Sequence, residues 1–529
     1  MASQHIISGP EVTTIDTSLG KSLYQSLVNH GNNIAMVDAL TGETRTFSDI
    51  LTRSLSVAEC LHIRGVTIGD VVGICSENNL DFILPVLASY YIGATCAPLN
   101  PYYTTRELLH AVNISKPRII FCSDGALKSV DEISHQVGFL KEIVTFGFPL
   151  SHKHTPFISF VRDKSRSFQL PDVNDLNITA AIQCSSGTTG LPKGVMLTQR
   201  NILSILQTAN DPRFTITKPG DVLLALLPMF HSYAFICQLI STTHGSKVVV
   251  MNKFEEELFL RSIQNHKITT LMLVPSLVVF LAKAKIVDEY DLSSVQHVFS
   301  GAAPLSKESE TLLKKRLRVQ SIKQAYGMTE TTLVVTLPPP NGNKSGSSGI
   351  LVAGVKCKVV DLETGRNLGP NKKGELCFKG PQIMKGYCGN AQETSAIFDA
   401  DGFLHTGDVG YYDDDGFFYI VDRVKELIKY KGYQVPPAEL EAVLINHPAV
   451  KDAGVIGVPD EAAGELPLAF VVKQPGARVT EDEIIKYMAG QVSPQKRLRG
   501  GVLFVDSIPK TNSGKILRKE LRSMLKSKL

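Results

Sequence analysis

The segment from residue 185 to 194, SSGTTGLPKG, combines residue types that can surround an anion. Its small residues let backbone N–H groups converge on an oxyanion, and its hydroxyls add further donors. Lys193 adds a point charge suited to phosphate. The segment differs from the common phosphate-binding loop, because only two residues separate Gly187 from Gly190 and the lysine lies between proline and glycine. Alone it indicates either an anion site or a solvated turn.

Three later segments supply groups that would complement such an anion. Residues 326–332, YGMTETT, place Glu330 among hydroxyls, where a carboxylate suits a magnesium ion that bridges phosphates. Asp408 follows HTG on a tight turn and can accept hydrogen bonds from two ribose hydroxyls. Lys515 follows a glycine-containing loop in PKTNSGKILRK. Taken singly, each residue has an ordinary explanation. Glu330 could belong to a helix N-terminus, Asp408 to a common turn, and Lys515 to the protein surface.

The elements around these segments predict an α/β fold. From Gly69 to about Pro275, short apolar runs such as VVGIC, ITAAIQC and KVVVM alternate with segments of helical spacing. Their continuous hydrophobicity marks strands buried on both faces of a largely parallel sheet. We expect TTLMLVPSL to be another such strand. The apolar window from residue 223 to 240 contains Pro, His, Ser, Tyr and Gln, and it is expected to be a buried strand, loop and helix rather than a transmembrane segment.

The pattern changes after the loop from Pro338 to Gly349, which is rich in Pro, Gly and Ser. The next segments alternate in hydrophobicity like antiparallel hairpins, with a strong turn signal at Asp415-Gly416. Beyond Arg423, helix-like and strand-like segments form a mixed α+β unit of a size sufficient for a domain. We therefore predict a large N-terminal domain, residues 1–423, of helix-flanked parallel-rich sheets plus a β-rich subdomain, and a small α+β domain, residues 424–529.

The bulk composition limits the kinds of partner. With 55 basic and 51 acidic residues, the net charge of +4 is too balanced to suggest nucleic acid or an anionic membrane as the main partner. The 529 residues exceed what a single core supports. The nine cysteines include no Cys-x-x-Cys pair, so neither a disulfide framework nor a zinc site is evident, and a reducing compartment fits best.

Taken together, the motifs resemble the adenylate-forming (AMP-binding) superfamily, which includes acyl-CoA synthetases, 4-coumarate–CoA ligases and beetle luciferases. The motifs that carry the resemblance, in chain order, are SSGTTGLPKGV, YGMTE, GELCFKGPQIMKGY, LHTGD, VDRVKELIKYKGYQVPPAELE and PKTNSGKILRK. The resemblance extends from about residue 20 to Lys528. It implies ATP, Mg²⁺ and coenzyme A as cofactors and co-substrates, and a carboxylic acid as the substrate.

The resemblance also implies roles for individual residues. Lys515, Thr329 and His231 would act in adenylation, Lys429 would serve the second half-reaction, and Glu330 would help to bind Mg²⁺. Lys425 would be the hinge residue, near residues 423–426, about which a mobile small domain rotates. The residues implied to contact ATP are Ser185, Ser186, Gly187, Thr188, Thr189, Gly190, Lys193, Tyr326, Gly327, Thr329, Asp408, Arg423 and Lys515.

The implied chemistry explains why these parts are needed. A carboxylate is a poor electrophile, and its attack on the α-phosphate of ATP yields an acyl-adenylate and pyrophosphate. The approach brings two anions together, so a lysine and a metal must offset the charge. The mixed anhydride then reacts with the thiol of coenzyme A, and no side-chain nucleophile is required. Because Lys515 and Lys429 cannot easily serve one static site, the small domain is expected to rotate between the two steps.

The implied acid pocket departs from beetle luciferases, which are otherwise the most similar in sequence pattern. Ser232 replaces a second histidine, Ala234 an aromatic residue, Asn210 an arginine and Leu333 a small serine. The added leucine fills volume and removes a hydroxyl, which disfavours a flat polar heteroaromatic acid and favours a flexible aliphatic one. The residues implied to line the substrate pocket are His231, Ser232, Ala234, Gly301, Ala302, Gly327, Met328 and Leu333.

We therefore expect a luciferase-like fatty acyl-CoA synthetase with a preference for medium-to-long chains. One alternative is luciferin 4-monooxygenase activity, weak or main, in which oxidation follows luciferin adenylation. Another is a 4-coumarate-type CoA ligase, favoured by the segments PMFHSYAF and SGKILRK. A third is a protein that binds an acyl nucleotide without turnover, which the complete set of catalytic positions disfavours.

The last three residues, Ser527, Lys528 and Leu529, match a peroxisomal address that an import receptor reads. A basic helix end would also place lysines there. The motif depends on its position in the chain, and we expect a peroxisomal protein that binds the import receptor through it.

Overall fold

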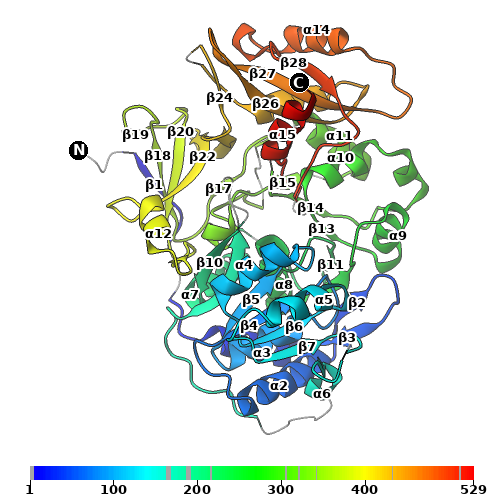
Figure 1. The fold of residues 1–529 in the computed structure, drawn as a ribbon, viewed down its shortest axis with the longest axis vertical. Coiled ribbons are helices and arrows are strands. Elements are labelled where there is room, and N and C mark those ends of the chain that lie inside the picture. The colour runs from blue at the N-terminus through cyan, green and yellow to red at the C-terminus, as the bar shows by residue number, and fades with distance from the viewer. Residues whose placement is uncertain are drawn as a thin grey trace.

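The structure is a computed structural model. It describes the chain except for residues 1–4, 13, 150, 162–167, 186–191, 215–216, 304, 306, 320–321, 341, 343, 432, 512–513 and 529, and the side chains of residues 526–528. A large domain holds two mainly parallel sheets and a β-rich subdomain, and a small C-terminal domain lies at one end of the molecule over β14, β15 and α10 (Figure 1). The mixed α/β architecture that the sequence predicts is therefore confirmed.

The first large sheet contains the segments that were expected to be buried strands, such as VVGIC and ITAAIQC. In this sheet, β9 is the last of the neighbouring parallel strands, and it pairs with β10 in antiparallel orientation. The strand β10 was not expected from the sequence, and it makes residues 186–192 the connection between two adjacent strands. In spatial order the strands are β21 (Gly386–Tyr387), β10 (Lys193–Thr198), β9 (Thr179–Ser185), β5 (Thr95–Leu99), β4 (Val71–Cys75), β6 (Ile119–Cys122), β7 (Glu142–Thr145) and β8 (Thr155–Pro156).

The second large sheet is parallel except for β3 at its edge. The expectation that TTLMLVPSL is one strand is wrong in its second half: β13 ends at Leu273 and a helix begins at Pro275, because proline fits the first turn of a helix but cannot donate to a ladder. The strands in order are β15 (Ile322–Gln324), β14 (His297–Ser300), β13 (Thr270–Leu273), β11 (Val222–Ala225), β12 (Lys247–Val250), β2 (Ile34–Asp38) and β3 (Thr44–Thr46).

Helices cover both sheets and share one core with them. Residues of α1, α3 and α8 belong to the same buried cluster as strand residues of each sheet, so these helices pack between the sheets. The segment from residue 223 to 240 is the expected strand, loop and helix, and no described helix is long and apolar enough to span a bilayer. The helices of the large domain are α1 (Leu19–His30), α2 (Phe47–Ile63), α3 (Ile83–Tyr91), α4 (Thr105–Ser115), α5 (Asp124–Ser134), α6 (Ile158–Val161), α7 (Gln199–Asn210), α8 (Ser232–His244), α9 (Glu256–His266), α10 (Pro275–Lys283), α11 (Lys307–Leu317) and α12 (Ala391–Ile397).

The β-rich subdomain follows the loop after residue 338 and forms an antiparallel sheet. The expected hairpin around Asp415-Gly416 is present, and Gly416 adopts a φ of +80° in its turn. The short pair β16 (Thr336–Leu337) and β17 (Ile350–Leu351) leads into it. The strands of the subdomain are β1 (Ile6–Ser8), β18 (Lys356–Val360), β19 (Asn367–Leu368), β20 (Gly374–Lys379), β22 (Leu404–Tyr412) and β23 (Phe418–Arg423).

The C-terminal domain has cores of its own, since two buried clusters are built from residues between 428 and 525. The chain passes directly from β23 into this domain, and Lys425 in the connection is exposed. Its strands, in spatial order, are β25 (Tyr433–Val435), β24 (Ile428–Tyr430), β27 (Gly464–Lys473) and β26 (Val450–Asp460), and β28 (Gly501–Phe504) also pairs with β27. Its helices are α13 (Pro437–Ile445), α14 (Glu481–Gln491) and α15 (Arg518–Lys528).

Candidate active site

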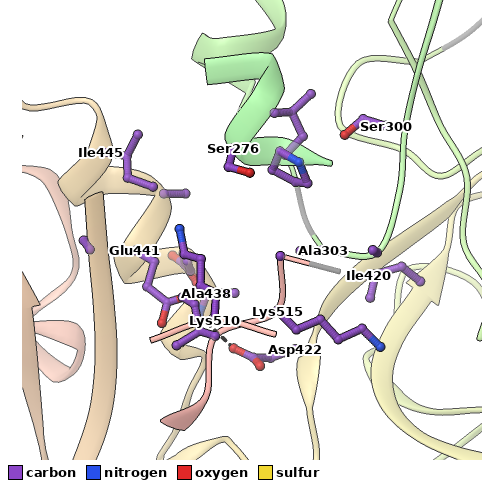
Figure 2. Close-up of a pocket in the computed structure, with 18 of the residues that line it drawn as sticks. Ser276, Ser300, Ala303, Ile420, Asp422, Ala438, Glu441, Ile445, Lys510 and Lys515 are labelled. Carbon is purple, nitrogen blue, oxygen red and sulfur yellow. Dashed lines mark hydrogen bonds between the residues drawn. The ribbon is translucent and has the colours of Figure 1, made fainter. Parts of the chain in front are cut away.

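A cleft of about 1490 Å³ lies between the two domains. Strand ends of the second sheet and of the β-rich subdomain form one side, and the loop before α15 contributes Lys515 from the other (Figure 2). The domains also touch beside the cleft, where Lys283 Nζ donates to the carbonyl of Ile445 at 2.9 Å. A site built in this way has its two walls on bodies that can move relative to each other.

Asp408 marks one end of the cleft. It lies in β22 directly after Gly407, whose φ of +71° falls where the pairing of β22 with β20 is irregular, so the tight turn expected at HTGD is instead a bulge within a strand. The Tyr326 hydroxyl donates to Asp408 Oδ2 at 2.6 Å, and Arg423 Nε lies 3.2 Å from Asp408 Oδ1. Burial raises the pKa of the Asp408 carboxyl, while Arg423 and Tyr326 act in the opposite direction. The three side chains therefore form one fixed, polar group that combines an acceptor with a cation.

Glu330 marks a second polar group. It lies on the short 3₁₀ helix Thr329–Thr331 and is only 4% exposed. One oxygen, Oε1, accepts hydrogen bonds from Ser185 Oγ and from the Tyr387 hydroxyl, each at 3.0 Å. Tyr387 was not predicted as a site residue, although it ends the quoted motif GELCFKGPQIMKGY. Its position in β21, beside β10, is a consequence of a strand pairing that the sequence did not reveal.

Lys193 lies at the start of β10 on the same side of the sheet as Tyr387. Its ammonium forms an ion pair with Glu393 and lies 4.9 Å from the centre of the Tyr387 ring. The predicted anion-binding loop thus begins at Ser185, beside Glu330, and ends at Lys193, beside Tyr387. Its other predicted members lie outside the described residues: Ser186, Gly187, Thr188, Thr189 and Gly190.

Lys515 reaches the polar groups from the C-terminal domain. Its neighbour Gly514 adopts a φ of +81° and lies against the large domain, where a Cβ atom on it would be 3.5 Å from Val274. Burial lowers the pKa of the Lys515 ammonium and Arg423 lowers it further, whereas Asp408 and Glu330 raise it. The lysine is therefore a desolvated cation within electrostatic reach of both acidic groups.

Lys429 lies elsewhere in this arrangement. It is an exposed residue of β24, and its backbone N–H donates to Glu465 Oε2 at 2.8 Å. Among the described residues, the lining of the cleft includes Lys515 and Lys425 but not Lys429. The structure thus holds one of the two lysines at the cleft and the other in solvent.

His231 and Ser232 connect the polar groups to an apolar region. His231 caps the N-terminus of α8, and its Nδ1 accepts from the Tyr233 backbone N–H at 3.4 Å. Burial, with a contribution from Lys515, lowers the pKa of His231 to about 4, so the ring is neutral at pH 7. The hydroxyls of Ser232 and Thr329 are 3.2 Å apart.

The apolar region has a small core of its own around Leu227, Ala234 and Val274, with Tyr233, Leu277 and Ala302 packed against it. Behind it lies an internal cavity of about 30 Å³, lined mainly by apolar side chains. The Tyr233 ring separates this cavity from Gly301, at which a Cβ atom would lie 3.2 Å from the ring. Tyr233 was not predicted from the sequence, because its aromatic ring alone is equally typical of a core residue.

Three further predicted pocket residues, Gly327, Met328 and Leu333, lie in closely packed surroundings. Gly327 and Met328 line the cleft, and a Cβ atom on Gly327 would lie 1.9 Å from the Leu333 carbonyl oxygen. Leu333 itself adopts a φ of +110°, an unfavourable conformation for a branched side chain, and it packs against the main core of the large domain. Among the described residues, five predicted pocket residues lie outside the lining of the open cleft: His231, Ser232, Ala234, Gly301 and Leu333.

Comparison with known proteins identifies the family. The family model described as AMP-binding enzyme matches residues 23–388, and the model described as AMP-binding enzyme C-terminal domain matches residues 439–515. The chain belongs to the AMP-binding enzyme family. This AMP-binding enzyme is 43% identical over 501 residues to luciferin 4-monooxygenase of Nipponoluciola cruciata, which covers 93% of this chain and 91% of that protein.

Two further relatives broaden the comparison. The AMP-binding enzyme is 40% identical over 511 residues to 4-coumarate–CoA ligase 3 of Arabidopsis thaliana, covering 95% of this chain and 90% of that protein. ATP-bound MatB of Rhodopseudomonas palustris has a TM-score of 0.85 and 28% identity, covering 96% of this chain and 99% of that chain. The family assignment makes the protein an enzyme that activates an acid by ATP-dependent adenylation.

Proposed function

We propose that this enzyme converts a medium-to-long-chain fatty acid, ATP and coenzyme A into acyl-CoA, AMP and pyrophosphate. The apolar group of Leu227, Ala234 and Val274 beside the cleft carries this proposal, because it offers hydrocarbon contacts next to a strongly polar site. Tyr233, Leu277 and Ala302 extend the same apolar wall. A flexible alkyl chain gains from such a surface without needing hydrogen-bond partners.

In the first step, the fatty carboxylate attacks the α-phosphorus of ATP, and the bond to the pyrophosphate oxygen breaks. Lys515 is placed to offset the charge of the carboxylate and the α-phosphate, since it is a half-buried cation in the cleft within electrostatic reach of Asp408 and Glu330. Asp408 would accept hydrogen bonds from the ribose hydroxyls, and Arg423 would hold that carboxylate in place. Thr329 and the neutral His231 would orient the reacting ends without adding charge.

A magnesium ion fits beside Glu330. This carboxylate is fixed by two hydroxyl donors on a single oxygen, and carboxylate oxygens are the donors that Mg²⁺ prefers. When bound, the ion would neutralise part of the charge on the phosphates. Ser185 and Tyr387 keep the Glu330 carboxylate oriented, and Lys193 adds positive charge at the other end of the loop.

In the second step, the sulfur of coenzyme A attacks the acyl carbon, and AMP leaves. Lys515 occupies the cleft in the arrangement seen here, whereas Lys429 is exposed on β24. We propose that rotation about Lys425 exchanges the two lysines between the steps, so that one cleft serves both reactions. The exposure of Lys425 and its position directly after β23 are consistent with a hinge.

Luciferin oxidation is the second candidate, and the 43% identity to a luciferin 4-monooxygenase favours it. The pocket residues Ala234 and Leu333 argue against it as the main activity, since one removes an aromatic stacking partner and the other adds bulk. A 4-coumarate-type reaction is supported in the same manner by the 40% identical ligase. It uses the same adenylation chemistry and differs only in the acid.

The proposed function is tested by product identification. Purified enzyme is incubated with ATP, Mg²⁺, coenzyme A and one acid at a time: saturated fatty acids of increasing length, cinnamic acids and luciferin. Mass spectrometry of the thioesters and a light measurement are made on each reaction. We expect fatty acyl-CoA as the main product, and formation of only cinnamoyl-type thioesters, or only light, would contradict the proposal.

We also propose that the protein is imported into peroxisomes through Ser527, Lys528 and Leu529. The first two end α15, and Leu529 lies outside the described residues. A fluorescent protein fused to the N-terminus should co-localise with a peroxisomal marker, and removal of the last three residues should abolish this. An unchanged distribution would contradict the proposal.

A further inference from the structure

A cluster of three potential metal ligands lies in the β-rich subdomain, on β20 and on β22, the strand that also carries Asp408. Glu375 and Cys377 are in β20, and His405 is in β22. One ligand atom from each, a carboxylate oxygen, the thiol sulfur and a ring nitrogen, lie within 4.8 Å of one another. Glu375 Oε2 is 2.8 Å from His405 Nδ1, and Cys377 Sγ is 3.4 Å from the same nitrogen.

The sheet itself fixes this convergence. Glu375 and Cys377 are two positions apart on one strand and therefore face the same side, and Cys377 lies directly opposite His405 on the adjacent strand. Tetrahedral zinc would separate such ligand atoms by roughly 3.3–3.6 Å, given usual bond lengths. To admit an ion, the contact of His405 Nδ1 with Glu375 Oε2 must lengthen from 2.8 Å by roughly 0.5 Å, and its contact with Cys377 Sγ from 3.4 Å by roughly 0.1–0.2 Å.

Burial and charge on this face also suit a cation. Cys377 is fully buried, whereas the side chains of His405 and Glu375 are 32% and 17% exposed, which leaves an open side for a water ligand. Lys358 pairs with Asp399 at 2.6 Å and lies 3.5 Å from Asp401. Lys379, two positions after Cys377 on β20, donates to the Asp401 carbonyl at 2.8 Å. Counting Glu375, Asp399 and Asp401 as −3 and Lys358 and Lys379 as +2 gives a local charge of −1 before a metal binds.

From these observations we propose that Glu375, Cys377 and His405 bind a zinc-class divalent cation, and that its binding weakens the binding of ATP. A thiolate and an imidazole select borderline ions such as Zn²⁺ over Mg²⁺, which requires oxygen ligands. Binding releases the thiol proton of Cys377 to solvent, together with the Nδ1 proton of His405 where the ring carries one. Three protein ligands and a water form an open tetrahedral site.

The link to ATP runs through Glu375. Its second oxygen, Oε1, accepts the Gly407 backbone N–H at 2.9 Å and so holds the bulged part of β22 directly before Asp408. The Thr406 hydroxyl, which donates to the Leu376 carbonyl, accepts the Asp408 N–H at 3.1 Å. An ion that draws Glu375 Oε2 toward itself would also shift Oε1, and with it the Gly407 backbone and the neighbouring Asp408 carboxylate that Tyr326 and Arg423 hold.

Cobalt titration of the full-length protein tests the binding. Protein freed of metal with a chelator and kept under reducing conditions is titrated with Co²⁺, which gives an intense near-ultraviolet band when a thiolate is a ligand. We expect the band to saturate at one equivalent and to be displaced by Zn²⁺ but not by excess Mg²⁺. Absence of the band in the wild-type protein would overturn the proposal.

Two variants identify the ligands. Cys377→Ser should abolish the band, and His405→Asn, which keeps the thiol, should lower the Co²⁺ affinity at least about tenfold. Cys60→Ser, which alters a half-buried thiol beside Phe160, is the control and should bind as the wild type does. Thermal melting of each protein shows whether it is folded. A band that persists in folded Cys377→Ser, or is lost equally in Cys60→Ser, would overturn the assignment.

The coupling between Zn²⁺ binding and ATP binding is measured as a change in the KM for ATP. Pyrophosphate release is followed with Mg²⁺ in excess, once without Zn²⁺ and once with enough Zn²⁺ to saturate the site. We expect Zn²⁺ to raise the KM severalfold in the wild type and in Cys60→Ser, with less effect in Cys377→Ser. An unchanged KM at full occupancy would overturn the coupling. Because the cobalt band is read without turnover, its failure is distinguishable from failure of the proposed acyl-CoA synthesis.

Discussion

The polar side and the apolar side of the candidate active site are built in different ways. On the polar side, Asp408 and Glu330 are each held by two named partners at 2.6 to 3.2 Å. On the apolar side, Ala234 and Val274 are held by packing alone. Hydrogen bonds require particular residue types at particular places, whereas packing requires only a suitable volume.

This difference separates what the enzyme does from what it acts on. In the proposed mechanism, the polar side performs the same adenylation whatever the acid, so ATP dictates its residue types. The apolar side decides between acids of similar chemistry, and one methylene or one hydroxyl there is worth only ~1–3 kcal/mol. Substitutions on the polar side should therefore change the rate with every acid, and those on the apolar side should change the order of preference.

The largest effect is expected for Lys515→Ala. Loss of the half-buried cation should lower acyl-adenylate formation by about 10²–10³-fold, while ATP binding changes modestly. Pyrophosphate release in a single turnover measures the step. Lys486→Ala, which removes an exposed lysine of α14, is the matched control. Unchanged pyrophosphate release in Lys515→Ala would show that the polar side does not depend on this lysine.

The next largest effect is expected for Lys429→Ala, and it should fall on the other half-reaction. Transfer from supplied acyl-adenylate to coenzyme A should slow by roughly 10–100-fold, with adenylation nearly unaffected, because Lys429 is outside the cleft in the arrangement with Lys515 inside. Rapid-quench measurement of thioester separates the steps. Equal losses in both steps would remove the special role of Lys429.

Tyr387→Phe should have a smaller effect on the polar side. It removes one of two hydroxyl donors to Glu330, and a hydrogen bond to a charged group of ~1.5 kcal/mol corresponds to about a tenfold loss in kcat/KM for ATP. The loss should be the same with every acid tested. Tyr487→Phe, in α14, is the control. A change that depended on the acid would place Tyr387 in the substrate pocket instead.

The pH dependence of adenylation should reflect Lys515 and not His231. Burial lowers the pKa of His231 to about 4, so the ring stays neutral from pH 6 to 8 and should give no inflection there. The pKa of Lys515 is also lowered, so its charge is lost as pH rises through a value below the usual ~10.4. Single-turnover rates should therefore fall at alkaline pH in the wild type. A group titrating near pH 6.5 would contradict the neutral histidine.

The smallest effect is expected on the apolar side, for Leu333→Ser. The substitution restores space and a hydroxyl, and it should raise luciferin adenylation about tenfold or less while lowering that of fatty acids. Because Leu333 has a φ of +110°, Leu333→Gly is a useful second variant that adds space without the hydroxyl. No change in luciferin adenylation or light in either variant would refute the steric explanation.

Most strands, and the polar residues beside them, were predictable because their types are restricted. Asp408, Glu330 and Lys515 were predicted from motifs; the structure places Asp408 and Lys515 in the lining of one cleft and Glu330 within electrostatic reach of Lys515. Tyr387 was missed because its role depends on the pairing of β21 with β10, a long-range contact that no local pattern encodes. The Glu375, Cys377 and His405 cluster was invisible for the same reason, since 28 residues separate Cys377 from its cross-strand partner His405.

The acid pocket was less predictable. Ala234 and Ala302 do pack together, as the sequence led us to expect, but Leu333 packs against the main core and Tyr233 separates Gly301 from the internal cavity. Both differences arise from backbone geometry, the positive φ of Leu333 and the close approach of Gly301 to a ring. Neither can be derived from residue type alone.

The preference for a fatty acid is tested most directly by one ratio in the wild-type enzyme. The kcat/KM for pyrophosphate release is measured with dodecanoate and with luciferin under identical ATP and Mg²⁺. The apolar wall of Leu227, Ala234 and Val274 predicts a ratio of at least about ten in favour of dodecanoate. A ratio of one or less would contradict the proposed substrate and assign the enzyme to the acids of its luciferase relatives.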